Sequence, residues 1–264
     1  NTNYGAAFAA KAAKSTNNDL NTAFERLSSG SRINFAKDDA AGQGISTRLA
    51  AEITSLDMAS RNASDAQSMI DTADGAYQEV HSMLLRMREI AVQASNGTLS
   101  DADRTALNAE VTALETEITS IANNTTFAGI NLGTGVSVAF QIGTSKGVTL
   151  THKFADFDVS AIGANIAVDS VSTATAALAT VDAAISTVSA NRGTLGAVSN
   201  RLSSTIANLD NISVNLSSAR GRIQDTDFAE ETSNLAKSQI MQQAATAMLA
   251  QANASKQTVL ALIQ

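Results

Sequence analysis

Few residues in this sequence have the types and spacing that catalysis or metal binding requires. There is no cysteine, and the two histidines, His81 and His152, lie far apart without the short spacing to a second ligand that a metal site needs. Asp38 and Asp39 form an adjacent acid pair, and paired carboxylates can exchange protons when a pocket surrounds them. This pair follows a lysine and precedes small residues, which favours a solvated ion pair or a helix cap.

The glycine-containing motifs also lack the context of a nucleotide site. Gly133-Thr134-Gly135 is a lone GxG without the strand-to-helix connection that a dinucleotide site needs. The sequence has no P-loop and no G-x-S-x-G nucleophile motif. We therefore predict that the protein is not an enzyme and that it has no catalytic residues, no metal ligands and no cofactor.

Composition narrows the class of protein. The 264 residues are 44% hydrophobic but only 4% aromatic, which suits thin helical bundles, and they include no proline, the residue that breaks helix interiors. The net charge is -7 and no basic patch is evident, which argues against nucleic-acid binding. No unbroken run of apolar residues is long enough to span a bilayer, so no membrane insertion is expected. The N-terminus lacks the pattern of a signal peptide, which by itself indicates the cytoplasm.

Apolar residues recur at helical spacing along most of the chain. Leu20, Phe24 and Leu27 share one helical face near the N-terminus. A second pattern runs from about residue 41 to 96, and at ~1.5 Å per residue this helix would be roughly 80 Å long, which indicates a rod. Ser100 and the acids after it predict an N-cap. A heptad follows, formed by Leu107, Val111, Leu114, Ile118 and Ile121.

Residues 127 to 168 change to a β pattern. Apolar residues alternate with polar or small ones over residues 136–142 and again over 148–154, with glycines between the two runs. This pattern predicts two strands joined by a turn, and so one β-hairpin region at about 130-160.

The C-terminal part returns to helical spacing after about residue 170, and Asp225-Thr226-Asp227 predicts a cap or a joint before the last helix. From Thr232 to Gln264 the only charged side chains are Lys237 and Lys256. Because a free helix in water carries a charged outer face, we expect copies of the chain to surround this helix. Burial within its own monomer is the alternative.

These elements predict the fold class. The protein is expected to be mainly α, with long antiparallel helices in a coiled-coil-like rod and one small β-hairpin region. Each end of the chain is helical and amphipathic, and neither has an obvious intrachain core beyond the other end. We therefore expect the N- and C-termini to pair with each other and with other molecules.

Several long motifs, in the same order along the chain, resemble the two terminal signatures of bacterial flagellins. They cover roughly residues 1 to 130 and 190 to 264. The matching segments are Arg26–Asn34, Ala36–Gly42, Arg86–Thr98, Ile121–Phe127, Asp225–Thr232 and Ala247–Asn253.

The resemblance implies a division into domains. Residues 1-40 and 225-264 would be the inner-tube terminal helices, a coiled coil that lines the filament lumen, and residues 41-224 would be the outer-tube helical domain with the hairpin. The family often inserts variable outer domains after the hairpin, and here helical spacing resumes near 170. We therefore expect a minimal flagellin with a comparatively thin and smooth filament.

The resemblance also implies a function and its residues. The chain would be a structural subunit that self-assembles into the extracellular helical flagellar filament used for swimming motility. We expect the terminal helices to provide the assembly contacts through Leu20, Phe24, Leu27, Phe228, Leu235, Met241, Met248, Leu249 and Leu260.

The partners implied are the chain itself, as a homopolymer, and the flagellar export chaperone, cap and junction proteins. Export would use the flagellar type III apparatus without a cleaved signal peptide. Arg86, Ile90 and Glu117 fall at places where many flagellins are bound by a vertebrate innate immune receptor, although the common residue at the Ile90 position is Leu. They form the candidate receptor patch.

Two other functions stay open from the sequence. A hook–filament junction protein shares flagellin-like ends but carries a larger and less similar middle. A flagellin-like cell-surface polysaccharide-binding protein would need an aromatic platform, and the chain has only two Tyr and eight Phe.

Overall fold

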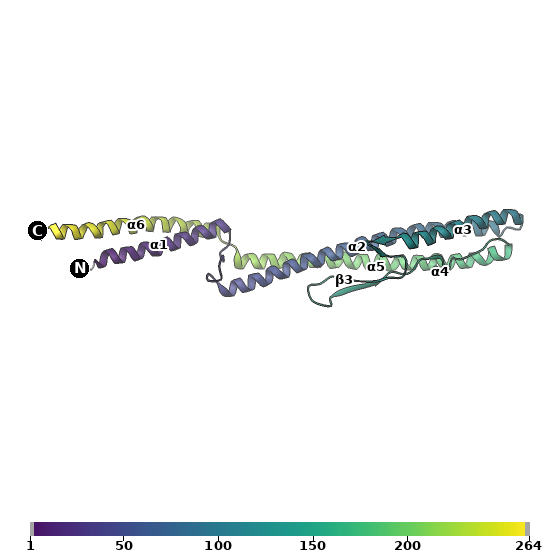
Figure 1. Cartoon of the computed structure of the whole chain (residues 1–264), viewed down its shortest axis with the longest axis horizontal. Coiled ribbons are helices and arrows are strands. Elements are labelled where there is room, and N and C mark those ends of the chain that lie inside the picture. Colours follow the sequence, from purple (N-terminus) through teal and green to yellow (C-terminus); the bar gives the residue numbers. More distant parts are fainter. Residues whose placement is uncertain (1–2, 262–264) are drawn as a thin grey trace. The chain divides into compact units, whose positions relative to one another are not determined.

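The computed structural model describes the backbone of residues 3–261 and the side chains of residues 3–255. Within that range the chain forms six helices and two small two-stranded antiparallel sheets, so the prediction of a mainly α protein with one hairpin region is confirmed. The chain divides into two compact units (Figure 1). The terminal unit comprises residues 1–53 and 214–264, and the central unit comprises residues 54–213.

The terminal unit is built around an antiparallel pair of helices, α1 (Tyr4–Ser29) and α6 (Phe228–Ala261). The direction follows from two hydrogen bonds between the helices. Asn3 Nδ2 donates to the Ala252 carbonyl over 3.0 Å, and Gln242 Nε2 donates to Asn17 Oδ1 over 2.6 Å. The prediction that the two ends of the chain pair with each other is therefore confirmed.

The chain leaves α1 through a left-handed glycine. Gly30 has φ 70°, which Gly adopts without steric cost, and its N–H donates to the Arg26 carbonyl to close the helix. The predicted joint at residues 225–227 lies against this turn, since the Thr226 N–H donates to the Gly30 carbonyl over 3.0 Å. Asp227 Oδ1 then accepts from the N–H groups of residues 229 and 230, so it caps the start of α6.

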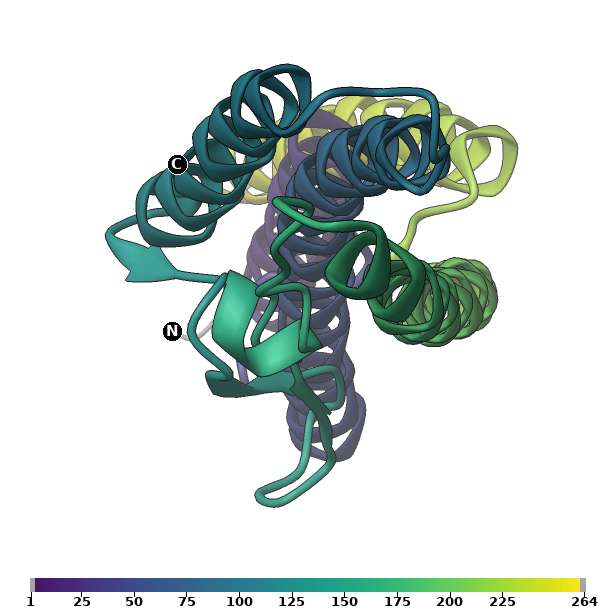
Figure 2. The same ribbon diagram turned by 90° about the vertical axis from the view of Figure 1, so that its right-hand side faces the viewer.

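Two long helices, α2 (Ala40–Ala94) and α5 (Val171–Gln224), contribute residues to both units. In the central unit they run antiparallel, and Figure 2 shows α2 between α5 and the shorter α3 (Asp101–Asn124). Arg192 Nε lies 2.8 Å from Asp74 Oδ1, and Arg88 Nε lies 2.6 Å from Asp182 Oδ1. These ion pairs bridge α2 and α5 on the surface.

The turn between α2 and α3 is held by a capping box and a buried arginine. Ser100 Oγ accepts from the Asp103 N–H, and the Asp103 carboxylate accepts from the Ser100 N–H, which confirms the predicted cap. Arg104 is buried, and its guanidinium donates to the carbonyls of Ala94 and Asn96. The bond to Ala94 satisfies a carbonyl group at the end of α2 that lacks an intrahelical partner, and the bond to Asn96 holds the turn that follows.

The β region packs on the helices. Two-residue strands β1 (Thr126–Phe127) and β2 (Ile130–Asn131) pair first, and then β3 (Ser137–Gln141) pairs with β4 (Thr149–Lys153) in the register Phe140↔Leu150. A single turn of helix, α4 (Val159–Ile162), leads on to α5.

The core of the central unit lies where the hairpin segment meets α2 and α5. Along α5 the buried large residues recur every seventh position, as a helix packed along one face requires. These are Val181, Val188, Leu195, Leu202 and Leu209. Tyr77 of α2 is fully buried, its ring centroid lies 4.6 Å from that of Phe157, and its hydroxyl donates to the Ala155 carbonyl over 2.8 Å.

One described helix, α5, is long and apolar enough to cross a membrane by length and composition, with a window of mean hydropathy 1.3. The sequence contains no unbroken apolar run, but Ala and Val dispersed among Ser and Thr raise this mean. A core helix of a water-soluble protein meets the same criterion, and one face of α5 packs into the core of the central unit.

Burial of Tyr77 should be visible in an alkaline titration. Desolvation, with a smaller contribution from the charge of Asp156, raises the pKa of the Tyr77 phenol above its usual value of about 10. In a Tyr4→Phe variant the only phenol left is Tyr77, so ultraviolet absorbance should show it ionising at a higher pH in the folded protein than in urea. A single transition at the same pH in both would contradict the buried position.

The raised pKa of Tyr77 also makes the stability of the protein depend on pH. Because the folded state holds this proton more tightly than the unfolded state, the contribution of Tyr77 to the free energy of unfolding is complete below pH about 10 and is lost as the pH rises above it. A Tyr77→Phe variant should lack this alkaline loss.

Candidate assembly surface

Small side chains at heptad spacing make up most of the buried residues between α1 and α6. On α1 the buried residues are Ala9, Thr16 and Ala23, each seven apart. On α6 the buried apolar residue is Ala245, and the half-buried Ser238 lies seven residues before it. Small side chains let two helix backbones approach closely, but they remove little apolar area from water. The pair is therefore close without having a large core.

Ten large apolar side chains among the described residues of the terminal unit are exposed. Their exposed fractions range from 42% to 81%. Single exposed apolar residues are ordinary, but a series of them on one unit marks a surface for association. The residues are Tyr4, Phe8, Phe24, Phe35, Ile45, Val214, Phe228, Ile240, Met241 and Met248.

Two open grooves lie among these side chains. One, of about 330 Å³, runs between Phe8 of α1 and Met248 of α6. The other, of about 620 Å³, lies between Phe24 at the end of α1 and Phe35 in the segment after it. The ammonium of Lys37 lies 4.9 Å from the centroid of the Phe35 ring, so a cation covers part of this aromatic surface.

The assembly residues expected from the sequence fall into two groups in the structure. The first group is half-buried along the pair and comprises Leu20, Leu27, Leu235 and Leu249. The second group is exposed and comprises Phe24, Phe228, Met241 and Met248. The side chain of Leu260 lies outside the described residues. The first group can hold α1 to α6, and the second can contact another molecule, but their role in assembly stays a prediction.

Sequence reasoning did not single out the small-residue seam or the ion pair beside it. Ala9, Thr16 and Ala23 are seven apart, and that spacing was the signal available in the sequence. Arg26 Nη1 lies 3.6 Å from Glu231 Oε2, a contact across 205 positions of sequence that no local pattern reveals.

The candidate receptor patch lies on the central unit. Arg86 is exposed on α2 and pairs with Glu110 of α3 at 2.8 Å and with Glu89 at 3.0 Å, and these carboxylates raise the pKa of its guanidinium. Glu117 is exposed on α3. Ile90, in contrast, is fully buried in the core. Arg86 and Glu117 are therefore accessible to a partner and Ile90 is not, while binding itself stays untested.

The residues considered for chemistry have structural positions. Asp38 Oδ2 accepts from the N–H groups of Phe35 and Asn34, which lowers the pKa of that carboxyl. Asp39 Oδ1 accepts from the Gly42 N–H over 2.8 Å in the first turn of α2. Asp39 therefore caps α2, one of the two roles expected for the pair, while Asp38 holds the loop that precedes the helix. Among the described residues no group of three or more His, Cys, Asp or Glu side chains could hold a metal ion.

The two terminal segments of the chain come together in one unit. The structure is therefore that of a mainly α protein whose ends pair and display apolar side chains. The bacterial flagellin N-terminal helical region matches residues 1–138, and the bacterial flagellin C-terminal helical region matches residues 178–263. The chain belongs to the bacterial flagellin family.

The similarity to individual flagellins extends over nearly the whole chain. A flagellin of Halalkalibacterium halodurans is 44% identical over 247 residues, which cover 92% of this chain and 91% of that protein. Flagellin A of Vibrio cholerae is 34% identical over 374 residues, covering 100% of this chain and 99% of that protein. The second alignment is longer than the 264 residues of this chain, so this chain is a minimal form without the additional residues of the Vibrio protein.

One solved structure supports the family, and a second shares the fold. The crystal structure of Bacillus cereus flagellin aligns with a TM-score of 0.52 at 31% identity, covering 56% of this chain and 88% of that chain. A putative flagellar hook-associated protein from Vibrio parahaemolyticus aligns with a TM-score of 0.61 at 16% identity, covering 71% of this chain and all of that chain. At that identity the second likeness shows a shared fold alone.

The different burial of the three patch residues predicts different effects of mutation. Ile90→Ala should lower the free energy of unfolding by about 2–4 kcal/mol, because it leaves a cavity in a packed core. Glu117→Ala, the exposed control, should change it by less than about 0.5 kcal/mol. Urea denaturation followed by circular dichroism measures both. Small effects of equal size for both variants would show that Ile90 is not packed as described. If the expected difference is found, receptor binding is best tested with substitutions of the exposed Glu117 and Arg86.

Proposed function

We propose that the chain is the structural subunit that self-assembles into the extracellular helical filament of a bacterial flagellum, which serves swimming motility. The observation that carries the proposal is the terminal unit. It is formed by the two segments that match the terminal regions of the flagellin family, and it exposes large apolar side chains. Contact with other copies would remove those side chains from water.

The proposed role is structural and needs no catalysis or cofactor. His152 packs against Phe154, Asp38 and Asp39 accept backbone N–H groups, and none of these three lines the two apolar grooves. Flagellin relatives of the chain are structural proteins, which is consistent with a protein that is not an enzyme.

Within the filament we propose that residues 1-40 and 225-264 form the inner tube and that residues 41-224 form the outer tube. The Ala-rich seam of α1 and α6 supports this assignment, because a pair with little core of its own gains from being surrounded. Beyond Glu231, α6 carries only two charged side chains, Lys237 and Lys256, so it would leave few unpaired charges inside such a tube.

We further propose that the terminal helices order fully on assembly. The small seam buries little apolar area, so the gain from pairing α1 with α6 does little more than offset the cost of ordering them. Weak pairing of α1 with α6 would also favour export of the chain through a channel, without a cleaved signal peptide. It would leave the C-terminal helix accessible to an export chaperone. Filament cap and junction proteins are further proposed partners, and an innate immune receptor would meet Arg86 and Glu117.

The structure gives less support to a junction protein or a polysaccharide-binding protein than to a filament subunit. The likeness to a hook-associated protein is one of fold. A polysaccharide-binding platform would need grouped exposed aromatics. The aromatics most exposed among the described residues, Tyr4 and Phe8, lie on α1 in the terminal unit.

A polymerisation test addresses the proposal directly. Purified chain is seeded with short filament fragments, and growth is followed by light scattering and electron microscopy beside a copy trimmed to residues 41–224. We expect the full chain alone to extend the seeds as thin hollow filaments, because the trimmed copy lacks the terminal pair. A full chain that stays soluble on competent seeds would contradict the proposed function and direct attention to the junction and glycan-binding alternatives.

Single substitutions on α6 should separate assembly from folding. Leu249→Glu places a charge in the half-buried face of the terminal pair, and Met248→Glu places one on its exposed face. Both should abolish seeded growth while the circular dichroism melting of the central unit stays unchanged, because burying an unpaired charge is strongly unfavourable. Met248→Leu and Leu249→Met keep the apolar surface and should polymerise. Normal filaments from the glutamate variants would contradict the assignment of α6 to subunit contacts.

A further inference from the structure

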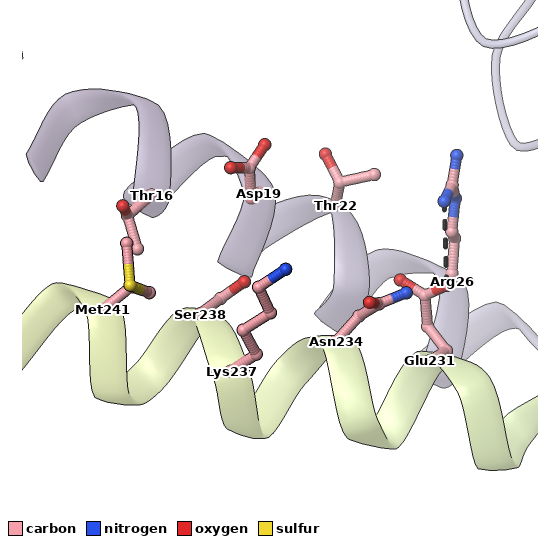
Figure 3. Close-up of a pocket in the computed structure, with 9 residues that line it drawn as sticks. All are labelled: Thr16, Asp19, Thr22, Arg26, Glu231, Asn234, Lys237, Ser238 and Met241. Atoms are coloured by element: carbon pink, nitrogen blue, oxygen red, sulfur yellow. Dashed lines mark ion pairs between the residues drawn. The ribbon is translucent and has the colours of Figure 1, made fainter. Parts of the chain in front are cut away.

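The two terminal helices face each other across a polar groove of about 440 Å³. Figure 3 shows its residues in two facing rows, with Thr16 level with Met241, Asp19 level with Ser238, and Arg26 level with Glu231. The groove therefore contains both acidic and basic side chains, in a pair of helices whose other buried side chains are small and whose leucines are half-buried.

The small-residue seam alone gives little register specificity. Its members on α1 recur every seven residues, and on α6 the positions Ser238, Ala245 and Ala252 also lie seven apart. A slip of one heptad places small side chains against small side chains again. It moves one helix by about 10 Å along the other without creating a clash in the seam.

The ion pair between Arg26 and Glu231 is a poor device for stability. The Glu231 side chain is only 10% exposed and the Arg26 side chain 30% exposed, so both are largely withdrawn from water. Their contact is long, at 3.6 Å, and Arg26 Nε is buried without a hydrogen-bond partner among the described residues. Replacing a buried ion pair of this kind by apolar residues is often neutral or stabilising. A pair that adds little stability can still discriminate between registers.

We propose that Arg26 and Glu231 determine the register of α1 against α6. A slip in one direction brings Glu231 level with Asp19 and sets two carboxylates against each other. A slip in the other direction leaves Arg26 level with the neutral Ser238 and takes Glu231 past the end of α1. Either slip leaves a charge without its partner in a partly dry groove, which is the costly outcome for such groups.

The other contacts of the pair do not replace this function. The hydrogen bond between Asn17 and Gln242 is neutral and exposed. The hydrogen bond from Asn3 Nδ2 goes to the Ala252 carbonyl, and every turn of a helix presents such a backbone carbonyl, so this bond does not specify one register. The hydrogen bond from the Thr226 N–H to the Gly30 carbonyl fixes the chain before α6 begins, and Glu231 lies in the first turn after it. Unwinding the first turns of α6 would allow a slip, and the Arg26–Glu231 pair opposes that unwinding.

The inference concerns the register of α1 and α6 whenever they are paired, in the free chain or in a filament. Its consequence for assembly rests on the proposed function, since every copy must display the exposed side chains of α6 at the same height as those of α1. A slip of about 10 Å would misplace this surface in one copy relative to its neighbours.

Disulfide trapping can read the register, because the chain has no cysteine of its own. A Cβ atom built at Gly5 lies 3.8 Å from the Ala252 Cβ, which is the usual separation in a disulfide. Gly5→Cys with Ala252→Cys therefore reports the native register. Gly5→Cys with Ala245→Cys, and Ala12→Cys with Ala252→Cys, report slips of one heptad in the two directions.

The decisive comparison is made in the full chain with Arg26→Met and Glu231→Leu together. We expect the ratio of native to slipped intrachain disulfide to fall about tenfold or more, while the helical signal and the melting temperature stay the same or rise. Lys237→Met changes a charge in the same groove outside the pair and should keep the native ratio, as should Arg26→Lys. A merely structural ion pair would lower the melting temperature and leave the ratio unchanged.

An unchanged ratio in the double variant overturns the proposal. Should that variant lose helical signal, the isosteric Glu231→Gln takes its place and the same ratio decides. The disulfides are quantified by peptide mass analysis in the fraction that shows the full helical signal, and sedimentation is recorded separately. A chain that never sediments contradicts the filament function and leaves the register result valid, because each counted disulfide forms within one chain.

Discussion

The close approach of α1 and α6 through small side chains is the constraint on which the rest of the terminal unit depends. Alanines at Ala9, Ala23 and Ala245 bring the helix backbones together, and for the same reason they leave little apolar surface to bury. The larger side chains, such as Phe8 and Met248, must then lie outside the seam. A unit built in this way has weak internal cohesion and a surface that other molecules can cover, which is the combination that a self-assembling subunit requires.

The central unit solves a different problem with the same kind of helices. Its seam on α5 carries Val and Leu at heptad positions, and the segment after the hairpin adds the buried rings of Phe154 and Phe157. Tyr77 fastens that segment to α2 by one hydrogen bond. Its interhelical ion pairs, such as Arg192 with Asp74, lie on the surface, where they cost little desolvation and add little stability. The central unit therefore has a much larger apolar core than the terminal unit.

Local signals in the sequence predicted most of the elements. Helical spacing and the absence of proline indicated the long helices, Ser100 and Asp103 formed the expected cap, and period-two alternation indicated β3 and β4. What could not be predicted depends on pairs of residues far apart in the chain. The burial of Ile90 follows from which face of α2 meets the core, and the Arg26–Glu231 contact follows from the register of the ends.

The distribution of charge along α6 affects both its contacts with other copies and its register against α1. The first turn carries Glu230 and Glu231, where the helix dipole favours acids, and beyond it the described side chains include one charge, that of Lys237. A helix with so few charges can be surrounded by neutral surfaces without leaving ions unpaired, but it also has few means of fixing its alignment. The one acid that faces Arg26 therefore carries more positional information than any other side chain of the helix, and it lies where pairing with α1 begins.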